Sequence, residues 1–159
     1  MIRSAAQNDI KSISTIYNHY IQTSIVTFEE EPVSIEEIKT RMNAEPELPW
    51  LVAKNEGDIV GFAYASSWKS RCAYRYSVET TIYLSPEATG RGIGKELYVA
   101  LLDELKEMSL HSIIGGIALP NPASVALHEK LGFEKVAHFK EVGRKFDRWI
   151  DVGYWELIF

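Results

Sequence analysis

The chain has 159 residues, of which 46% are hydrophobic and 25% charged, a balance typical of one globular domain, and we expect that domain to span residues 1–159. The formal net charge of -5 leaves no excess of lysine and arginine for a phosphate backbone, so nucleic acid is disfavoured as a partner. No apolar run approaches transmembrane length and no signal peptide is evident, so we expect a cytoplasmic protein without a membrane partner. Cys72 is the single cysteine, which excludes an internal disulfide and a cysteine-based metal cage.

The first third of the chain predicts a short strand followed by two helices. Ile2 opens the strand. Apolar side chains then recur at helical spacing, at Ile10, Ile13, Ile16, Tyr17, Tyr20 and Ile21. A second helix begins after Ser34, because Ser34 and Glu37 have the spacing of a capping box and Val33 and Ile38 that of a hydrophobic staple. A polar and aromatic loop, TSIVTFEEEP, separates the two helices.

The middle of the chain predicts three strands and a long helix. The runs WLVAKN and IVGFAYAS, joined by EGD, predict a β-hairpin. The run YSVETTIYLSP is rich in β-branched and aromatic residues and predicts a further strand, which Pro86 stops. One face of a long helix follows, traced by Ile93, Leu97, Leu101, Leu105 and Met108.

The last third predicts a buried strand, a short helix and a terminal hairpin. The strand is SIIGGIA, and the helix starts at Asn121 and Pro122 and stops at Gly132. Two strand-like runs follow Phe133 around a polar connection at about residues 143–147. The resulting order, β, α, α, β, β, β, α, β, α, β, β, indicates an α+β fold around one central sheet of about seven strands, with about four helices.

A glycine-rich junction, TGRGIGK, lies between the strand that Pro86 stops and the long helix. Its alternate positions are glycine, at Gly90, Gly92 and Gly94. These glycines let the backbone approach a ligand, and the first helical turn presents free amides and the positive end of the helix dipole. We therefore predict a pyrophosphate site, to which Arg91 and Lys95 add charge-assisted contacts. The P-loop motif fails because Glu96 follows the lysine, and the dinucleotide fingerprint fails because Leu97 stands where a glycine is required.

The segment YLSPEATGRGIGKELYVALL resembles the coenzyme A-binding motif of the GNAT acetyltransferase superfamily, with Thr89 in place of the motif's first Arg or Gln. The segment NPASVALHEKLGF, residues 121–133, resembles the second signature of that family. Further strings, among them TFEEEP, AYASSWKSRCAYRYSVETTIYLSP and WIDVGYWELIF, extend the resemblance along the whole chain and are similar to the phosphinothricin and methionine-sulfoximine acetyltransferase branch. The resemblance implies the GNAT-type acyl-CoA N-acyltransferase fold, acetyl-CoA as co-substrate, and a homodimer to which the C-terminal hairpin contributes.

The resemblance also implies which residues hold acetyl-CoA. The strand before the glycine-rich junction and the strand SIIGGIA splay apart in this family, and the pantetheine arm enters between them. Its backbone partners are then Ile82, Tyr83 and Leu84. The pyrophosphate is assigned to Gly90, Arg91, Gly92, Ile93, Gly94 and Lys95. Asn121 and Ser124 lie within reach of the cofactor arm.

Acetyl transfer to an amine requires a base for the nitrogen and a proton for the departing thiolate. Glu79 matches the proposed general base of the family, and strand alternation places it on one polar face with Ser77 and Thr81. His128 stands where many GNAT enzymes carry a tyrosine that protonates the thiolate, and a histidine titrates near neutral pH. The alternative is a buried histidine with a structural role.

For the acceptor, Arg71 and Tyr74 match the acceptor-binding positions of the branch, and Phe28 lies in the loop that covers the acceptor in relatives. Arg75 is a further candidate, with a solvent-exposed role as its alternative, and Lys69 lies beside them. An acetylated Cys72 is disfavoured because no activating base is evident in the sequence. No metal is expected, since His19, His111 and His138 lack metal-ligand spacing.

We therefore expect direct transfer, within a ternary complex, from acetyl-CoA to the amino group of a small amino-acid-like substrate of the phosphinothricin, methionine sulfoximine or methionine sulfone type. Two alternatives remain open at this point. The acceptor is another amine, such as a polyamine, a drug or a protein N-terminus, and the acidic net charge suits a cationic acceptor slightly better. Or the chain is a non-catalytic acyl-CoA sensor that uses the glycine-rich junction for binding only.

Overall fold

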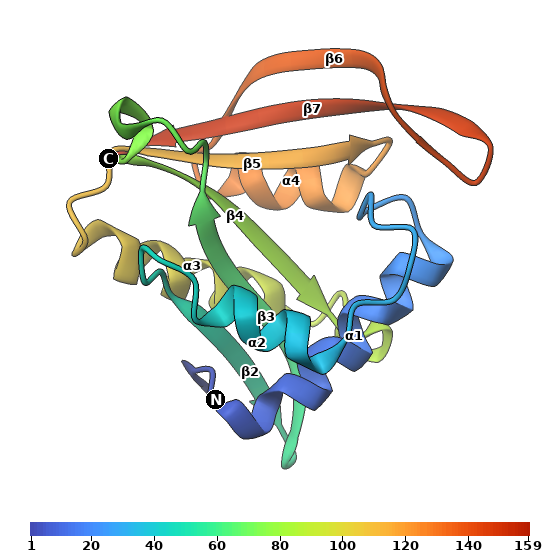
Figure 1. The fold of residues 1–159 in the computed structure, drawn as a ribbon, viewed down its shortest axis with the longest axis vertical. Helices are drawn as coiled ribbons and strands as arrows, with labels where there is room; N and C mark the ends of the chain where they lie inside the picture. The colour runs from blue at the N-terminus through green and yellow to red at the C-terminus, as the bar shows by residue number, and fades with distance from the viewer.

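The computed structural model describes all residues, 1–159, and its elements follow one another in the predicted order (Figure 1). The strands are β1 (Ile2–Ser4), β2 (Trp50–Asn55), β3 (Asp58–Ser67), β4 (Ser77–Leu84), β5 (Ser112–Leu119), β6 (Glu134–Lys145) and β7 (Arg148–Ile158). The α-helices are α1 (Ile10–Thr23), α2 (Ile35–Met42), α3 (Ile93–Lys106) and α4 (Pro122–Lys130). Single 3₁₀ turns lie at Gln7–Asp9, Cys72–Tyr74 and Pro86–Ala88.

All seven strands form one sheet in the order β1-β2-β3-β4-β5-β7-β6. Every neighbouring pair is antiparallel except β4 and β5, which run parallel. These two strands pair only from Ser77–Ser112 to Glu79–Ile114, and beyond that point they diverge (Figure 1). We call this divergence the splay. Because β5 stays paired with β7 along its whole length, the splay leaves the end of β4 without a neighbour on its β5 side.

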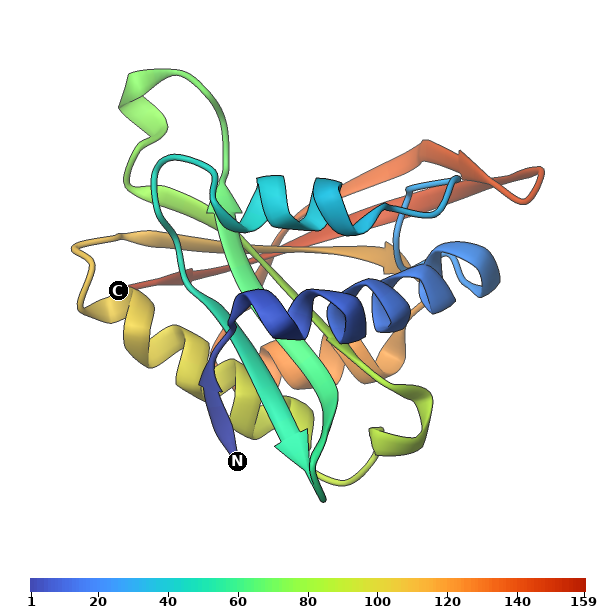
Figure 2. The ribbon, with the colours of Figure 1, turned by 60° about the horizontal axis from the view of Figure 1, so that its bottom comes forward.

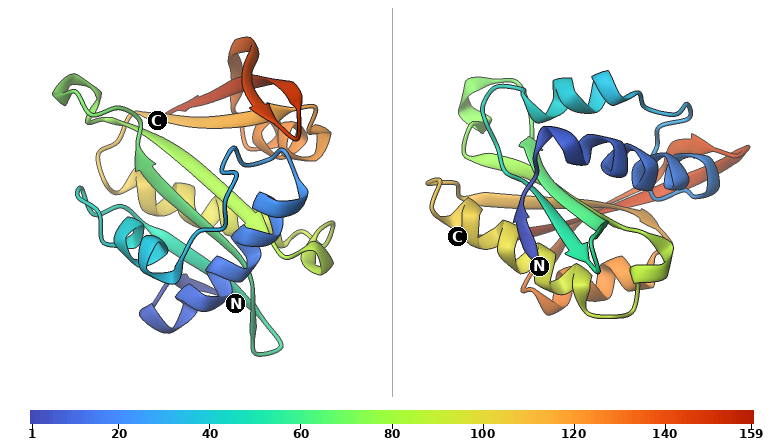
Figure 3. Two further views of the ribbon diagram at one scale, coloured as in Figure 1. Left: turned by 45° about the vertical axis from the view of Figure 1, so that its right-hand side comes forward. Right: turned by 90° about the horizontal axis from the view of Figure 1, so that it is seen from below.

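The helices cover both faces of the sheet, α1 and α2 on one and α3 and α4 on the other (Figures 2 and 3). The α3 face is closed by a core of Leu97, Tyr98, Leu101 and Leu105 against β2 to β5. The α1 face holds a second core around Ile13, Ile21, Ile38, Val52 and Phe62. Alternate residues of β2, β3 and β4 therefore serve two different cores, which explains the nearly continuous apolar runs of these strands in the sequence.

Two local predictions need correction. The Ser34 hydroxyl accepts the Glu37 amide at 3.1 Å, as predicted, but the Glu37 carboxylate binds Arg41 Nε at 2.8 Å instead of the Ser34 amide. An arginine one turn further along the helix is a stronger partner for a carboxylate than a backbone amide, so only half of the capping box forms. The long helix ends at Lys106, so Met108 lies outside it and is 40% exposed.

The terminal hairpin is tighter than predicted. The connection expected at 143–147 is reduced to Phe146 and Asp147, whose φ angles of 51° and 56° are those of a two-residue turn between twisted strands. Strand β6 continues through the predicted connection by way of an irregularity between Phe139 and Gly143. A bulge lets a strand absorb polar residues without ending, which the sequence pattern did not indicate.

Candidate active site

The glycine-rich junction forms a concave backbone turn at the start of α3. Gly90 and Gly92 have φ angles of 72° and 83°, a left-handed conformation that side chains other than glycine rarely adopt. Gly92 is the residue at the helix N-cap, and the amides that follow it have no intrahelical partner. Arg91 and Lys95 are exposed and form no ion pair. The turn therefore presents unpaired donors and two free cations, which suits a diphosphate.

Gly94 has a different role, because it allows close packing between α3 and β4. A methyl group added there would lie 3.3 Å from Leu84 Cδ1 and 4.0 Å from Ile82 Cδ1. The junction is thus directly beside the unpaired end of β4. Thr89, the position that departs from the family motif, uses its hydroxyl within the turn and donates it to the Pro86 carbonyl at 2.8 Å.

The unpaired end of β4 contains the predicted pantetheine partners Ile82, Tyr83 and Leu84. One acceptor there is already in use, since the Tyr20 hydroxyl donates to the Leu84 carbonyl at 2.7 Å. On the other side of the splay, Asn121 caps α4 and accepts the Ser124 amide at 3.1 Å. An anion-binding turn next to a free strand edge fits a ligand that joins a diphosphate to an extended amide-containing arm, as acetyl-CoA does.

Glu79 lies at the last residue pair before the splay. Its carboxylate is half-buried, forms no hydrogen bond or ion pair, and has its pKa raised by burial alone. A methyl group added to Gly116 of β5 would lie 2.9 Å from Glu79 Oε1 and 3.1 Å from a Tyr154 ring carbon, so a glycine is needed there to seat the carboxylate. An unpaired carboxylate with a raised pKa is suited to accept a proton.

His128 lies on the opposite face of the sheet. A methyl group added to Gly115 would lie 2.5 Å from His128 Nε2, whereas its neighbour Gly116 faces Glu79. Successive residues of a strand point to opposite faces, so the two predicted catalytic residues are separated by β5. The structure thus places Glu79 and His128 on opposite faces of β5 and not in direct contact.

Both nitrogens of His128 are engaged. Nδ1 lies 2.8 Å from the Ser124 carbonyl and must donate to it, so Nε2 accepts the Tyr98 hydroxyl at 3.0 Å. The Tyr98 oxygen in turn lies 2.6 Å from the Thr80 hydroxyl. Burial lowers the pKa of His128, so the imidazole is neutral near pH 7. The proton that Nε2 accepts is that of the Tyr98 hydroxyl, and nothing in the sequence singled out Tyr98.

The lowered pKa of His128 predicts a stability change with pH. The unfolded state protonates near 6.5 and the folded state at a lower pH, so stability is complete above about pH 6.5 and is lost as the pH falls further. We expect the melting temperature of the wild type to fall below pH 6.5 more steeply than that of His128→Gln. The exposed His111, changed to glutamine, is the matched control. Parallel curves for wild type and His128→Gln would contradict the assignment.

The predicted acceptor residues divide into two groups. Arg71 is exposed and forms no ion pair, and Tyr74, 38% exposed, lies on the adjacent 3₁₀ turn. Arg75 is bound by its own loop, because it donates to the Cys72 carbonyl at 3.1 Å and covers the Tyr76 ring at 4.4 Å. Lys69 lies over Trp68. Arg71 is therefore the arginine of this loop whose guanidinium has no partner within the loop.

Phe28 belongs to the second group. Its ring packs against Gly143 of β6 and it is 42% exposed. In all views the segment between α1 and α2 lies at the opposite end of the molecule from the loop between β3 and β4 (Figures 1 and 2). One chain therefore does not bring Phe28 together with Arg71 and Tyr74.

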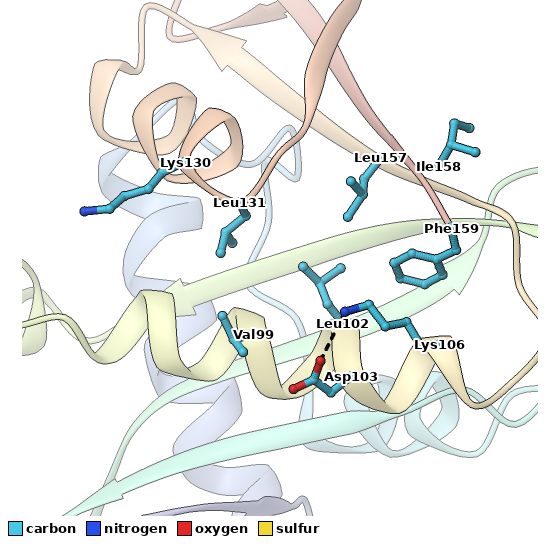
Figure 4. A pocket seen from close by; sticks show the side chains of 9 residues that line it. All are labelled: Val99, Leu102, Asp103, Lys106, Lys130, Leu131, Leu157, Ile158 and Phe159. Carbon is cyan, nitrogen blue, oxygen red and sulfur yellow. Dashed lines mark hydrogen bonds and ion pairs between the residues drawn. The ribbon is translucent and has the colours of Figure 1, made fainter.

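Two hollows in the surface differ in their relation to the predicted site residues. One, of about 500 Å³, lies between the second half of α3, the end of α4 and the end of β7, and contains none of the predicted site residues (Figure 4). The other, of about 360 Å³, lies on the α1 face and is lined by Arg41, Trp50, Tyr64 and Ser66 among others. Ser66 is the direct cross-strand neighbour of Glu79. Sequence reasoning missed this hollow because its lining combines the end of α2, the α2–β2 connection and the end of β3, which only the folded sheet brings together.

The structure holds no group of three or more His, Cys, Asp or Glu side chains arranged to bind a metal ion. None of its helices is both long and apolar enough to cross a membrane.

Comparisons with known proteins agree with this geometry. Residues 2–153 match the family model described as an acetyltransferase (GNAT) domain. The chain is 40% identical to a phosphinothricin N-acetyltransferase of Streptomyces coelicolor, over 98% of this chain and 94% of the relative. It is 34% identical to the L-methionine sulfoximine/L-methionine sulfone acetyltransferase of Salmonella typhimurium, over 98% and 92%. The crystal structure of a phosphinothricin acetyltransferase from Sinorhizobium meliloti in complex with acetyl-CoA superposes with a TM-score of 0.96 at 38% identity, covering 99% of this chain and 87% of that one. The chain therefore belongs to the GNAT acetyltransferase family.

Proposed function

We propose that this enzyme transfers the acetyl group of acetyl-CoA directly to the amino group of a small amino acid of the phosphinothricin, methionine sulfoximine or methionine sulfone type. The observation that carries the proposal is the Glu79 carboxylate, half-buried and unpaired at the splay. The names of the relatives support the choice of acceptor. A sensor that only binds acyl-CoA has no use for a carboxylate with a raised pKa at this position.

The proposed base and the proposed proton donor of the reaction lie on opposite faces of the sheet. Acetyl-CoA supplies the acetyl group as a thioester. The amides after Gly92, with Arg91 and Lys95, bind its diphosphate, and the free edge of β4 orients its arm. On the α1 face, Glu79 accepts the proton from the ammonium group of the acceptor and so frees the nitrogen lone pair for attack. On the α3 face, the Tyr98 hydroxyl, which neutral His128 orients by accepting it at Nε2, gives its proton to the departing thiolate, and the second proton that the nitrogen loses on acylation restores that hydroxyl.

The acceptor site combines the hollow beside Ser66 with a cation from the loop that follows Ser67, the last β3 residue of the lining. A volume of about 360 Å³ suits an amino-acid-sized molecule and is small for a folded protein surface. Arg71, exposed and without an ion pair, is the proposed partner of the acceptor's acidic group, with Tyr74 beside it. Because an arginine repels a polyamine, this assignment favours a zwitterionic acceptor.

We also propose a cytoplasmic homodimer of single-domain chains. The edge strand β6 and its turn carry large exposed apolar side chains, namely Val136, Phe139, Val142 and Phe146, and Trp149 follows on β7. An apolar edge strand is a liability unless another chain covers it, which supports an interface between two copies. One sheet that includes strands from both ends of the chain supports a single domain, and an exposed, unpaired Cys72 is consistent with a reducing compartment.

A panel of amines tests the proposed function. Purified protein and acetyl-CoA are mixed with millimolar phosphinothricin, methionine sulfoximine, methionine sulfone, spermidine or a short peptide, and release of the CoA thiol is measured. We expect the three amino acids to give the highest kcat/KM. N-acetylated phosphinothricin, in which the amino group is blocked, is the control and must give no release. Turnover with spermidine or the peptide alone would overturn the choice of acceptor, and no turnover with any amine would overturn catalysis itself.

A further inference from the structure

The segment between α1 and α2 is held from the far end of the chain. Lys145, the last residue of β6, donates from Nζ to the carbonyls of Ser24 and Thr27, both at 2.8 Å. Its side chain is buried, with 3% of the residue exposed. Figures 1 and 2 show the β6–β7 hairpin passing beside this segment. We call residues 24–34 the α1–α2 loop.

The same hairpin makes a second contact with the loop. Gly143 lies directly against the Phe28 ring, where a side chain would collide with ring carbons. On the opposite side, the loop rests on β4, because the Tyr83 hydroxyl donates to the Val26 carbonyl at 3.2 Å. Tyr83 shares a strand face with Glu79. The hairpin therefore presses the loop onto the face of the sheet that carries the proposed base.

The loop continues to the acceptor hollow through an ion pair. The Glu29 carboxylate binds the Arg41 guanidinium at 2.6 Å. Arg41 lines the same hollow as Ser66, the cross-strand neighbour of Glu79. A displacement of residues 24–29 therefore moves the partner of Arg41 and changes the wall of the hollow. The diphosphate-binding turn, at the start of α3, makes no hydrogen bond to this loop.

A buried lysine is costly unless its donors are paired, so this ammonium group serves a purpose beyond filling space. Burial lowers the pKa of Lys145, and the nearby Glu30 and Glu29 oppose the shift. Two charge-assisted hydrogen bonds to main-chain carbonyls fix the backbone itself, whichever side chains the loop carries.

We propose that Lys145 is a positioning residue for the acceptor, acting through the α1–α2 loop and the Glu29–Arg41 pair. The inference rests on the proposed function, because it concerns binding of the amine that Glu79 deprotonates. It assigns to the C-terminal hairpin a role in acceptor affinity, in addition to its role as an interface.

The test compares Lys145→Met with Lys145→Arg, and Lys140→Met is the matched control, an exposed lysine of the same strand without a side-chain partner. Methionine keeps the length of the side chain and removes both donors, so we expect the KM for the acceptor to rise about tenfold or more. The KM for acetyl-CoA is expected to change less than about twofold. Arginine retains the charge and the donors and is expected to recover most of the affinity. Hydrogen exchange of the amides in residues 24–29 is expected to accelerate in Lys145→Met only.

Several outcomes overturn the inference. An unchanged KM for the acceptor in Lys145→Met overturns it, even if hydrogen exchange of the loop accelerates. An equal rise in the KM for the acceptor and the KM for acetyl-CoA also overturns it. If Lys145→Met does not fold, Lys145→Gln replaces it, because the shorter amide side chain cannot reach both carbonyls; the same rise confined to the acceptor KM is then required. An unchanged exchange rate of residues 24–29 in the variant that is used overturns the anchoring of the loop. If the wild type acetylates no amine, the proposed function fails separately.

Discussion

Glu79→Gln is expected to lower kcat by about 10²- to 10⁴-fold, the range that a positioned general base contributes. Glutamine has the size of the carboxylate and still fits over Gly116, but it cannot accept a proton from the acceptor's ammonium group. Affinity for CoA, measured by calorimetry, is expected to stay within about twofold, because the diphosphate is bound at the far end of β4. Glu104→Gln, an exposed change on α3, is the matched control.

The pH dependence of this variant follows from the raised pKa of Glu79. In the wild type, kcat/KM is expected to rise with pH through an apparent pKa above the ordinary value of 4.5, and Glu79→Gln lacks this limb. For folding, a raised pKa means that the protonated carboxyl is favoured by the native state. Its contribution to stability is complete below the unfolded pKa and is lost as the pH rises through the folded pKa. Glu79→Gln should therefore melt at a higher temperature than the wild type at pH 7, and at the same temperature near pH 4.

These measurements separate three readings of the site. Retained CoA affinity with lost turnover supports a base at Glu79. Full turnover in Glu79→Gln would show that Glu79 is not the base and that another group accepts the proton. A wild type without turnover, which nevertheless binds CoA, would indicate a sensor.

The sequence was most informative where function depends on contiguous residues. The glycine-rich junction is a local structure, so its left-handed glycines and the start of α3 follow from a few adjacent letters. The cap at Asn121 and the stop at Gly132 are equally local and are found as predicted. The element order was also predictable, because apolar periodicity reports which face of each element is buried.

Contacts between segments that are distant in the chain could not be predicted from the sequence. Tyr98 meets His128 across 30 positions, and Lys145 meets Thr27 across 118. In each case the local sequence pattern predicts only that the residue belongs to a helix or a strand. Which residue it contacts depends on how the whole sheet packs. The same reason explains why Glu79 and His128 lie on opposite faces, since this depends on β5 standing between them. It also explains the separation of the α1–α2 segment, which contains Phe28, from the β3–β4 loop, which contains Arg71 (Figure 1).

Gly92→Asp is expected to raise the KM for acetyl-CoA by about a hundredfold or more. Asp is among the residues that tolerate a positive φ, and nothing lies within 4 Å of an added Cβ at this position, so the fold should persist. A carboxylate at the N-cap of α3 is moreover attracted by the helix dipole and by the free amides. The carboxylate therefore occupies the position of the diphosphate and repels it. For two unit charges 4 Å apart, this repulsion is about 4 kcal/mol at the effective dielectric constant of a protein surface.

Gly57→Asp is the matched control for this variant. Gly57 also has a positive φ, of 102°, and open space around an added Cβ, but it lies in the turn between β2 and β3, away from any helix start. It should leave both KM values unchanged. S-acetylpantetheine, a thioester without a diphosphate, provides the internal check, because Gly92→Asp and wild type should use it equally well. If Gly92→Asp weakened both thioesters to the same extent, the defect would lie in the arrangement of the site as a whole, and the turn would not be a diphosphate-binding element.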